Sequence, residues 1–119
     1  VVPPDIRFGN STFTEVPSYL DFSNMTDMNA LFSGCNKLVT ISHLDTQNAT
    51  NMNSIFSNCR SLISISHLDT KNVTNMNSMF YMCNNFNQDI SSWDVSNVKY
   101  YSYVFLSCPI EEKYKPKFK

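Results

Sequence analysis

The stretch TNMNSIFSNC at residues 50–59 decides the fold, because it recurs along the chain. It returns as TNMNSMFYMC at residues 74–83, a looser copy precedes it at residues 26–35, and a degenerate copy follows at residues 99–108. The first three copies are 24 residues apart, and the fourth follows after 25. A fixed period in this range is typical of proteins built from stacked structural repeats. We therefore interpret the chain as a tandem repeat.

The first part of each copy has the spacing of a short helix. Met52, Ile55, Phe56 and Cys59 fall at positions i, i+3, i+4 and i+7. This spacing places four apolar side chains on one face of an α-helix. Thr50 precedes them and is a residue type that caps the N-termini of helices. The sequence therefore predicts one short helix in each copy.

The second part of each copy has the character of a strand. Residues 62–68 (LISISHL) are rich in β-branched side chains and lack helical spacing, which predicts a short strand. Residues 69–72 (DTKN) carry side chains that bond to nearby backbone and predict a turn. One copy of 24 residues cannot bury enough apolar surface to fold alone, so we expect the copies to stack on one another.

The chain of 119 residues has the length of one domain. We predict a single domain, 1–119, that divides into an N-terminal cap with half a repeat at 1–27, repeats at 28–51, 52–75 and 76–100, and a partial repeat with a C-terminal cap at 101–119. The tail after Pro109 alternates lysine with aromatic residues. An alternative interpretation of this tail is a basic docking segment for an anionic partner.

The composition excludes some classes of partner. A net charge of -1 gives no electrostatic reason to expect binding to nucleic acid. The sequence has no run of about 18 apolar residues, so we expect no membrane insertion of this segment. The chain begins at Val1 without an apolar export signal, which we interpret as a trimmed segment or a mature chain.

The four cysteines follow the repeat period, at Cys35, Cys59, Cys83 and Cys108. This spacing differs from the C-x-x-C spacing of common metal sites. We interpret each cysteine as one small buried residue of its copy. Because adjacent copies of a stack lie close together, a disulfide between neighbouring cysteines is the alternative.

Repeated polar residues offer candidates for a metal site, and their pattern argues against one. His43 and His67 are one repeat apart, and Ser92 takes the third place, so the column lacks the ligands that zinc needs. Repeated Asp and Asn lack the glycines of calcium-binding repeats and predict turns instead. The chain has no glycine-rich phosphate loop and no nucleophile motif. We expect no enzyme activity and no cofactor.

The repeat unit resembles the BspA-type leucine-rich repeat, which is also described as a mycoplasma-type repeat of unknown function. The resemblance covers residues 13–110, and the segment FNQDISSWDVSNV at residues 86–98 carries it most closely. It implies an α/β repeat fold, namely a leucine-rich-repeat-like right-handed solenoid. About four rungs of 24–25 residues would each contain a short strand and a short helix, with a cap at both ends. It also implies a bacterial protein of the cell surface that takes part in adhesion or host contact.

Two surfaces of such a stack are candidates for binding a partner. On the strand side, two histidines occupy equivalent positions of successive copies. On the helix side, two large apolar residues replace serines of earlier copies. These two residues lie beside three tyrosines of the last copies. The residues that we predict to bind a partner are His43, His67, Tyr81, Tyr100, Tyr101, Tyr103 and Leu106. The tyrosines have an alternative role, which is to close the end of the stack.

The function that we predict is a non-enzymatic protein-interaction or adhesion module of a bacterial surface protein. Its partner would be a protein or a host-surface ligand, and its location would be the cell surface or the secreted fraction. One alternative is an interaction scaffold in the cytoplasm, because reduced, buried cysteines suit that compartment equally well. Another is a structural spacer within a longer surface array. The sequence leaves the oligomeric state open.

Overall fold

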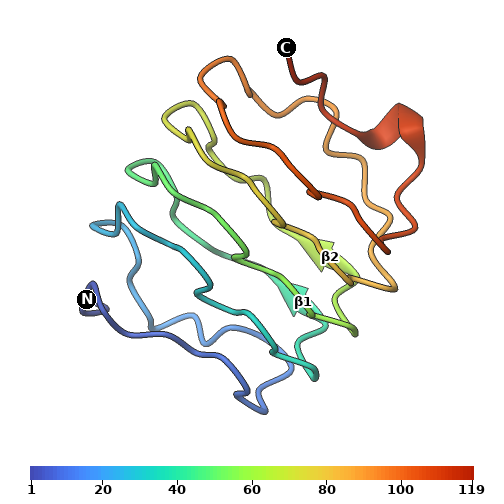
Figure 1. Cartoon of the computed structure of the whole chain (residues 1–119). Coiled ribbons are helices and arrows are strands. Elements are labelled where there is room, and N and C mark those ends of the chain that lie inside the picture. The colour runs from blue at the N-terminus through green and yellow to red at the C-terminus, as the bar shows by residue number, and fades with distance from the viewer.

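The computed structural model describes all residues from 1 to 119, and successive copies of the repeat run side by side (Figure 1). The two termini lie at opposite ends of this stack, which measures 33 × 27 × 20 Å. Strand β1 (Thr40–Ile41) pairs in parallel with β2 (Ser64–Ile65). The one helical element is a 3₁₀ turn, η1 (Glu112–Tyr114), in the C-terminal tail.

This architecture overturns the predicted fold. The leucine-rich-repeat-like right-handed solenoid was expected to have a short helix and a short strand in each of about four rungs. The chain has no α-helix, and its regular strands are limited to the two residues each of β1 and β2. The copies are instead irregular coils that bond to their neighbours through the backbone.

The predicted helix is absent because alternate backbone N–H groups bond outside their own copy. Met52 and Ser54 donate to the carbonyls of Asn75 and Asn77 in the next copy, each at 2.9 Å. The N–H of Ile55 donates three residues back, to the carbonyl of Met52, and closes a tight turn. In an α-helix that begins after Thr50, the N–H of Ser54 would donate to the carbonyl of Thr50, and that of Ile55 to the carbonyl of Asn51. The neighbouring copy and the helix therefore compete for the same donors, and in the stack the donors go to the neighbour.

Left-handed backbone at two positions of each copy is a second reason why the predicted helix is absent. The φ angles of Ser54 and Asn58 are 59° and 62°, and those of Ser78 and Met82 are 58° and 63°. A helical residue has φ near −63°. The chain thus turns repeatedly and still directs positions i, i+3, i+4 and i+7 inward. All four apolar side chains of the predicted helical face are fully buried, so the spacing identified the inward residues and misidentified the element.

Phenylalanines form a continuous column through the core. The ring centroids of Phe32 and Phe56 are 6.2 Å apart, and those of Phe56 and Phe80 are 5.4 Å apart. Phe105 continues the column at 5.8 Å from Phe80. Each ring meets its own equivalent in the next copy, so the repeats share one hydrophobic core and support each other.

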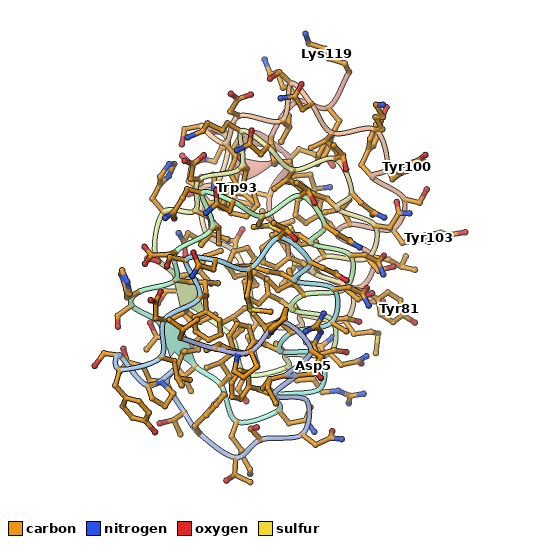
Figure 2. The ribbon with its side chains drawn as sticks, turned by 90° about the vertical axis from the view of Figure 1, so that its left-hand side faces the viewer. Asp5, Tyr81, Trp93, Tyr100, Tyr103 and Lys119 are labelled. Carbon is orange, nitrogen blue, oxygen red and sulfur yellow. The ribbon has the colours of Figure 1, made fainter.

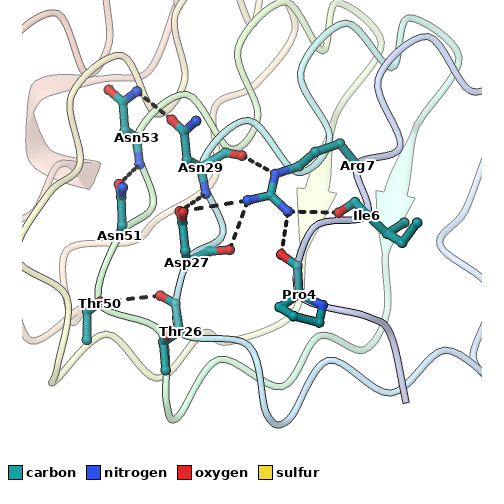
Figure 3. A network of polar contacts seen from close by, with 9 residues as sticks. All are labelled: Pro4, Ile6, Arg7, Thr26, Asp27, Asn29, Thr50, Asn51 and Asn53. Atoms are coloured by element: carbon teal, nitrogen blue, oxygen red, sulfur yellow. Dashed lines mark hydrogen bonds and ion pairs between the residues drawn. The ribbon is translucent and has the colours of Figure 1, made fainter.

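Polar side chains also join successive copies. Asn72 donates from Nδ2 to the carbonyl of Gln47 at 2.9 Å, and Asn48 makes the equivalent bond one copy earlier. Thr50, which we predicted to cap a helix, instead donates its hydroxyl to the carbonyl of Thr26 at 3.3 Å (Figure 3). These bonds explain why asparagine and threonine recur at fixed places in each repeat, since each residue serves the contact between copies.

The repeated aspartates form turns at three of their four positions. Oδ1 of Asp94 accepts the N–H of Ser96 at 3.0 Å, and Asp21 and Asp69 accept equivalent bonds. Asp45 accepts no such bond. These carboxylates therefore organise local backbone, as the turn interpretation of the sequence expects.

Arg7 closes the N-terminal end of the stack. Its Nε donates to the carbonyl of Asn29 at 2.5 Å, and its Nη2 donates to the carbonyl of Asp27 at 3.2 Å (Figure 3). The backbone N–H of Phe8 donates to the carbonyl of Leu31 at 2.8 Å. In later copies the equivalent carbonyls accept backbone N–H groups of the preceding copy. The guanidinium group therefore supplies donors that an earlier copy would otherwise provide.

The C-terminal tail folds back over part of the third copy. The N–H of Ile90 donates to the carbonyl of Tyr114 at 3.0 Å, and Oδ1 of Asn87 accepts the N–H of Glu111 at 2.9 Å. Phe118 is partly buried against the core. The tail thus covers the second half of that copy.

Candidate functional site

A hollow on the outer surface gathers three of the predicted binding residues. Its volume is about 450 Å³. The residues that line it, which we call the tyrosine patch, are Ser54, Ser57, Ser78, Tyr81, Tyr103 and Leu106. Tyr103 is 69% exposed and Leu106 is 49% exposed. Figure 2 shows Tyr81 and Tyr103 along one edge of the molecule, with Tyr100 further along the same edge.

The repeat explains why these side chains face outward. Tyr103 takes the place of Ser54, and both residues have left-handed backbone with φ of 59°. Tyr81 and Leu106 take the place of Ser57, immediately after the phenylalanine that each copy contributes to the core column. The patch is therefore a local change of side chains on a scaffold whose backbone repeats.

A second and larger hollow, of about 910 Å³, lies between the last copies and the tail. Its wall combines residues within 91–96, 101–106 and 112–119, and we call it the tail cavity. Tyr103 and Leu106 contribute to both hollows, so the tyrosine patch and the tail cavity are continuous at these two side chains.

Tyr101 and Tyr100 differ from the other tyrosines. The ring of Tyr101 stacks on Phe118 with centroids 4.7 Å apart, and its hydroxyl donates to the carbonyl of Lys119 at 2.6 Å. Tyr101 therefore holds the tail in place, which is the alternative role that the sequence left open. Tyr100 is 57% exposed and lines neither hollow.

The tail brings four lysines to the wall of the tail cavity. Nζ of Lys115 lies 2.6 Å from Oε1 of Glu112, and Nζ of Lys113 lies 3.7 Å from Oε1 of Glu111. Lys115 also lies over a phenylalanine ring of the last copy. The other two lysines, at 117 and 119, form no ion pair. The cavity wall therefore has an excess of positive charge.

The two histidines lie apart from these hollows. His43 and His67 are both exposed, and neither lines the tyrosine patch or the tail cavity. Nε2 of His43 lies 3.4 Å from Oδ2 of Asp45. The structure therefore divides the predicted binding residues into two separate groups, and the histidine group lines neither of these two hollows.

The cysteines form a column of protonated thiols in the core. Cys59 donates from Sγ to the carbonyl of Phe32 at 3.2 Å, and Cys35 and Cys83 make equivalent bonds. All four cysteines are free, and Cys108 is the one that is partly exposed. Burial raises the pKa of Cys35 to about 11 and that of Cys83 to about 12. Since the thiolate is the nucleophile, the thiols of Cys35 and Cys83 are inert at neutral pH in the folded chain.

Sequence reasoning missed the roles of Arg7, Gln88 and Phe118. Arg7 precedes the clear repeats, so no periodic signal distinguished it. Gln88 lies where the third repeat holds an extra residue, and that irregularity was a usable signal. Phe118 lies in a tail that departs from the repeat, and its contact with the last copy depends on how the tail folds back.

Together, the fold and the surface define a tandem-repeat protein of stacked irregular coils with an aromatic patch at its last copies. A family described as "Mycoplasma protein of unknown function, DUF285" matches residues 7–115, and the chain belongs to this family. The match agrees with the mycoplasma-type resemblance of the repeat, although it does not identify the BspA type specifically. Searches of curated proteins and of solved structures found no match. None of the chain forms a long apolar helix that could cross a membrane.

Proposed function

We propose that this chain is a protein-interaction or adhesion module of a bacterial surface protein, and that it binds its partner through the tyrosine patch without catalysing a reaction. The observation that carries the proposal is the exposure of Tyr103 and Leu106 around one hollow. The same positions hold serine in the copy at 52–75. Exposed tyrosines suit binding, because each can bury a large ring and also offer a hydroxyl to the partner.

Membership of a Mycoplasma family supports a bacterial source. The likeness of the repeat to BspA-type leucine-rich repeats supports display at the cell surface, where the partner would be a protein or a host-surface ligand. A stable interface buries roughly 800 Å² on each partner. The patch would supply the apolar centre of such an interface, and Tyr100 further along the same edge would extend it (Figure 2).

The test replaces patch residues by those of an earlier copy. A Tyr103→Ser/Leu106→Ser variant restores the side chains of the copy at 52–75, so the scaffold should still fold. We expect the purified variant to bind intact host cells and immobilised matrix glycoproteins about tenfold more weakly than the parent chain. Ile63→Ser is the matched control, since Ile63 is 57% exposed and lies outside both hollows.

A second measurement tests the location. Protease treatment of intact bacteria should digest a displayed chain, whereas a cytoplasmic scaffold would remain intact until the cells are lysed. A displayed chain that binds no host surface would indicate a structural spacer. Either of these two outcomes would contradict the proposal.

A further inference from the structure

Each copy offers a row of backbone N–H groups to the copy that follows it. In the third copy these groups belong to alternate residues, and they donate to carbonyls of the last copy at 2.7–2.9 Å. The donors are Met76, Ser78, Phe80 and Met82, and the acceptors are Tyr100, Ser102, Val104 and Leu106. The row contributes a set of backbone hydrogen bonds between one coil and the next in the absence of helices and long strands.

The last copy has the same row with no acceptor. The N–H groups at the equivalent positions form what we call the donor edge, and they belong to Tyr101, Tyr103, Phe105 and Ser107. None of them donates to a backbone or side-chain acceptor of the chain. An unpaired edge of this kind is a template for pairing with another extended chain.

The two ends of the stack differ in this respect. Arg7 already donates to the carbonyls of Asp27 and Asn29, which belong to the acceptor edge at the N-terminal end (Figure 3). A second copy of this chain could therefore pair head to tail with the donor edge only by displacing a guanidinium group from two hydrogen bonds. This argues that the occupant of the donor edge is a different molecule.

The charge beside the donor edge indicates the chemistry of that molecule. Tyr101, Tyr103 and Phe105 belong to the donor edge and also line the tail cavity. The acidic side chains of that cavity are Asp94 and Glu112, and its basic side chains are Lys113, Lys115, Lys117 and Lys119. Lys117 and Lys119 have no ion-pair partner within the chain. An acidic occupant would therefore gain electrostatic attraction at this end.

We propose that the donor edge binds an extended acidic peptide segment of another protein, which adds to the last copy as a further strand. This rests on the proposed function and specifies its partner. Carbonyls on one side of an extended peptide recur every second residue, as the N–H groups of the donor edge do. Glutamate or aspartate side chains of the peptide would lie near Lys117 and Lys119, and the exposed ring of Tyr103 would flank its backbone.

The experiment follows the backbone amides of the ¹⁵N-labelled chain by NMR. The probe is an end-capped peptide of about nine residues that alternates glutamate and threonine, because threonine favours an extended backbone. We expect the amide protons of the donor edge to shift downfield and to exchange more slowly with solvent as the peptide is added. A peptide with lysine in place of glutamate should leave them unchanged.

Charge reversal provides a second, independent readout. A Lys117→Glu/Lys119→Glu variant should bind the acidic peptide about tenfold more weakly, because it replaces attraction by repulsion. The matched control is Lys37→Glu/Arg60→Glu, which makes the same change of net charge on exposed side chains without ion-pair partners.

Three outcomes would overturn the inference. The peptide could fail to bind, it could perturb only lysine side chains, or the donor-edge amides could shift with protein concentration alone, which would make a second copy the occupant. The proposed function can be tested independently of the donor edge, because the Tyr103→Ser/Leu106→Ser variant keeps every N–H of that edge. If that variant binds host surfaces as tightly as the parent chain and both bind the peptide, the tyrosine patch is ruled out and the donor edge stands.

Discussion

The side-chain amide of Gln88 takes the place of a backbone peptide beside Ile65. Oε1 of Gln88 accepts the N–H of Ile65 at 2.8 Å, and Nε2 donates to the carbonyl of the same residue at 2.8 Å. The third copy holds one extra residue in this region and forms no strand next to β2. Gln88 therefore satisfies the edge of β2 that a third strand would otherwise cover.

Gln88→Ala should lower the free energy of unfolding by about 1–3 kcal/mol, because it leaves the backbone groups of Ile65 without partners in a largely buried place. Urea denaturation measures the change. Gln47→Ala is the matched control, since the side chain of Gln47 is exposed and forms no hydrogen bond. Equal stability of the two variants would contradict the role of Gln88.

The left-handed positions predict opposite effects for the two alanines of the chain. Ala30 has φ of 58°, where glycine avoids the strain of a side chain, so Ala30→Gly should raise the free energy of unfolding by about 0.5–1 kcal/mol. Ala49 is fully buried and is not among the left-handed residues, so Ala49→Gly should lower it by about 1 kcal/mol. Thermal and urea unfolding of both variants test the contrast, and a loss of stability in Ala30→Gly would refute it.

The thiols should react in an order set by their exposure. Cys108 is partly exposed and should be alkylated first in the folded chain, whereas Cys59 and Cys83 should react only after unfolding. Raising the pH to about 9 should not make Cys83 reactive, because burial raises the pKa of its thiol to about 12. Mass spectrometry after brief alkylation gives the order. The denatured, unreduced chain is the control, and fewer than four reactive thiols there would reveal disulfides that contradict this structure.

The turn carboxylates should make the fold sensitive to acid. The hydroxyl and then the backbone N–H of Ser96 lower the pKa of Asp94, and Ser23 does the same for Asp21. A folded-state pKa below the unfolded value contributes stability above the ordinary carboxyl pKa and loses it as the pH falls through the folded value. The melting temperature should therefore decrease as the pH drops below about 4.

Asp94→Asn tests the assignment, because an asparagine keeps the acceptor for Ser96 and removes the titration. Its melting temperature should depend less steeply on pH below about pH 4 than that of the parent chain. Asp5→Asn is the control, since Asp5 is exposed and accepts no hydrogen bond. Identical pH profiles for the parent chain and Asp94→Asn would show that this turn does not contribute.

Much of the interior could be predicted from spacing. The period places Phe32, Phe56 and Phe80 at one position of successive copies, and that alone implies that their rings meet. The burial of Cys59 and the turn at Asp94 follow from the same argument, because each depends on a position that recurs. The helix was predicted wrongly, since its apolar spacing is also produced by consecutive tight turns.

The candidate binding surface was predictable only in part. Tyr81 and Leu106 stood out because they replace a serine of earlier copies, and the structure brings them to one hollow. The histidines were singled out because they share a position in the repeat. That spacing carries no information about whether the surface there is hollow. Tyr101 looked equivalent to its neighbours in the sequence, and only its contact with Phe118 assigns it to the tail.

The sequence by itself determined the repeat, its period and the residues that face inward, because a side chain at a recurring position must meet its equivalent when copies stack. Only the tertiary structure decided what the backbone does between those side chains. A backbone N–H can donate within its own copy or to the next one, and local sequence does not distinguish the two. Because each copy donates its N–H groups to the copy that follows, the N–H groups of the last copy, at Tyr101–Ser107, have no acceptor. At the N-terminal end, Arg7 donates to the carbonyls that have no preceding copy.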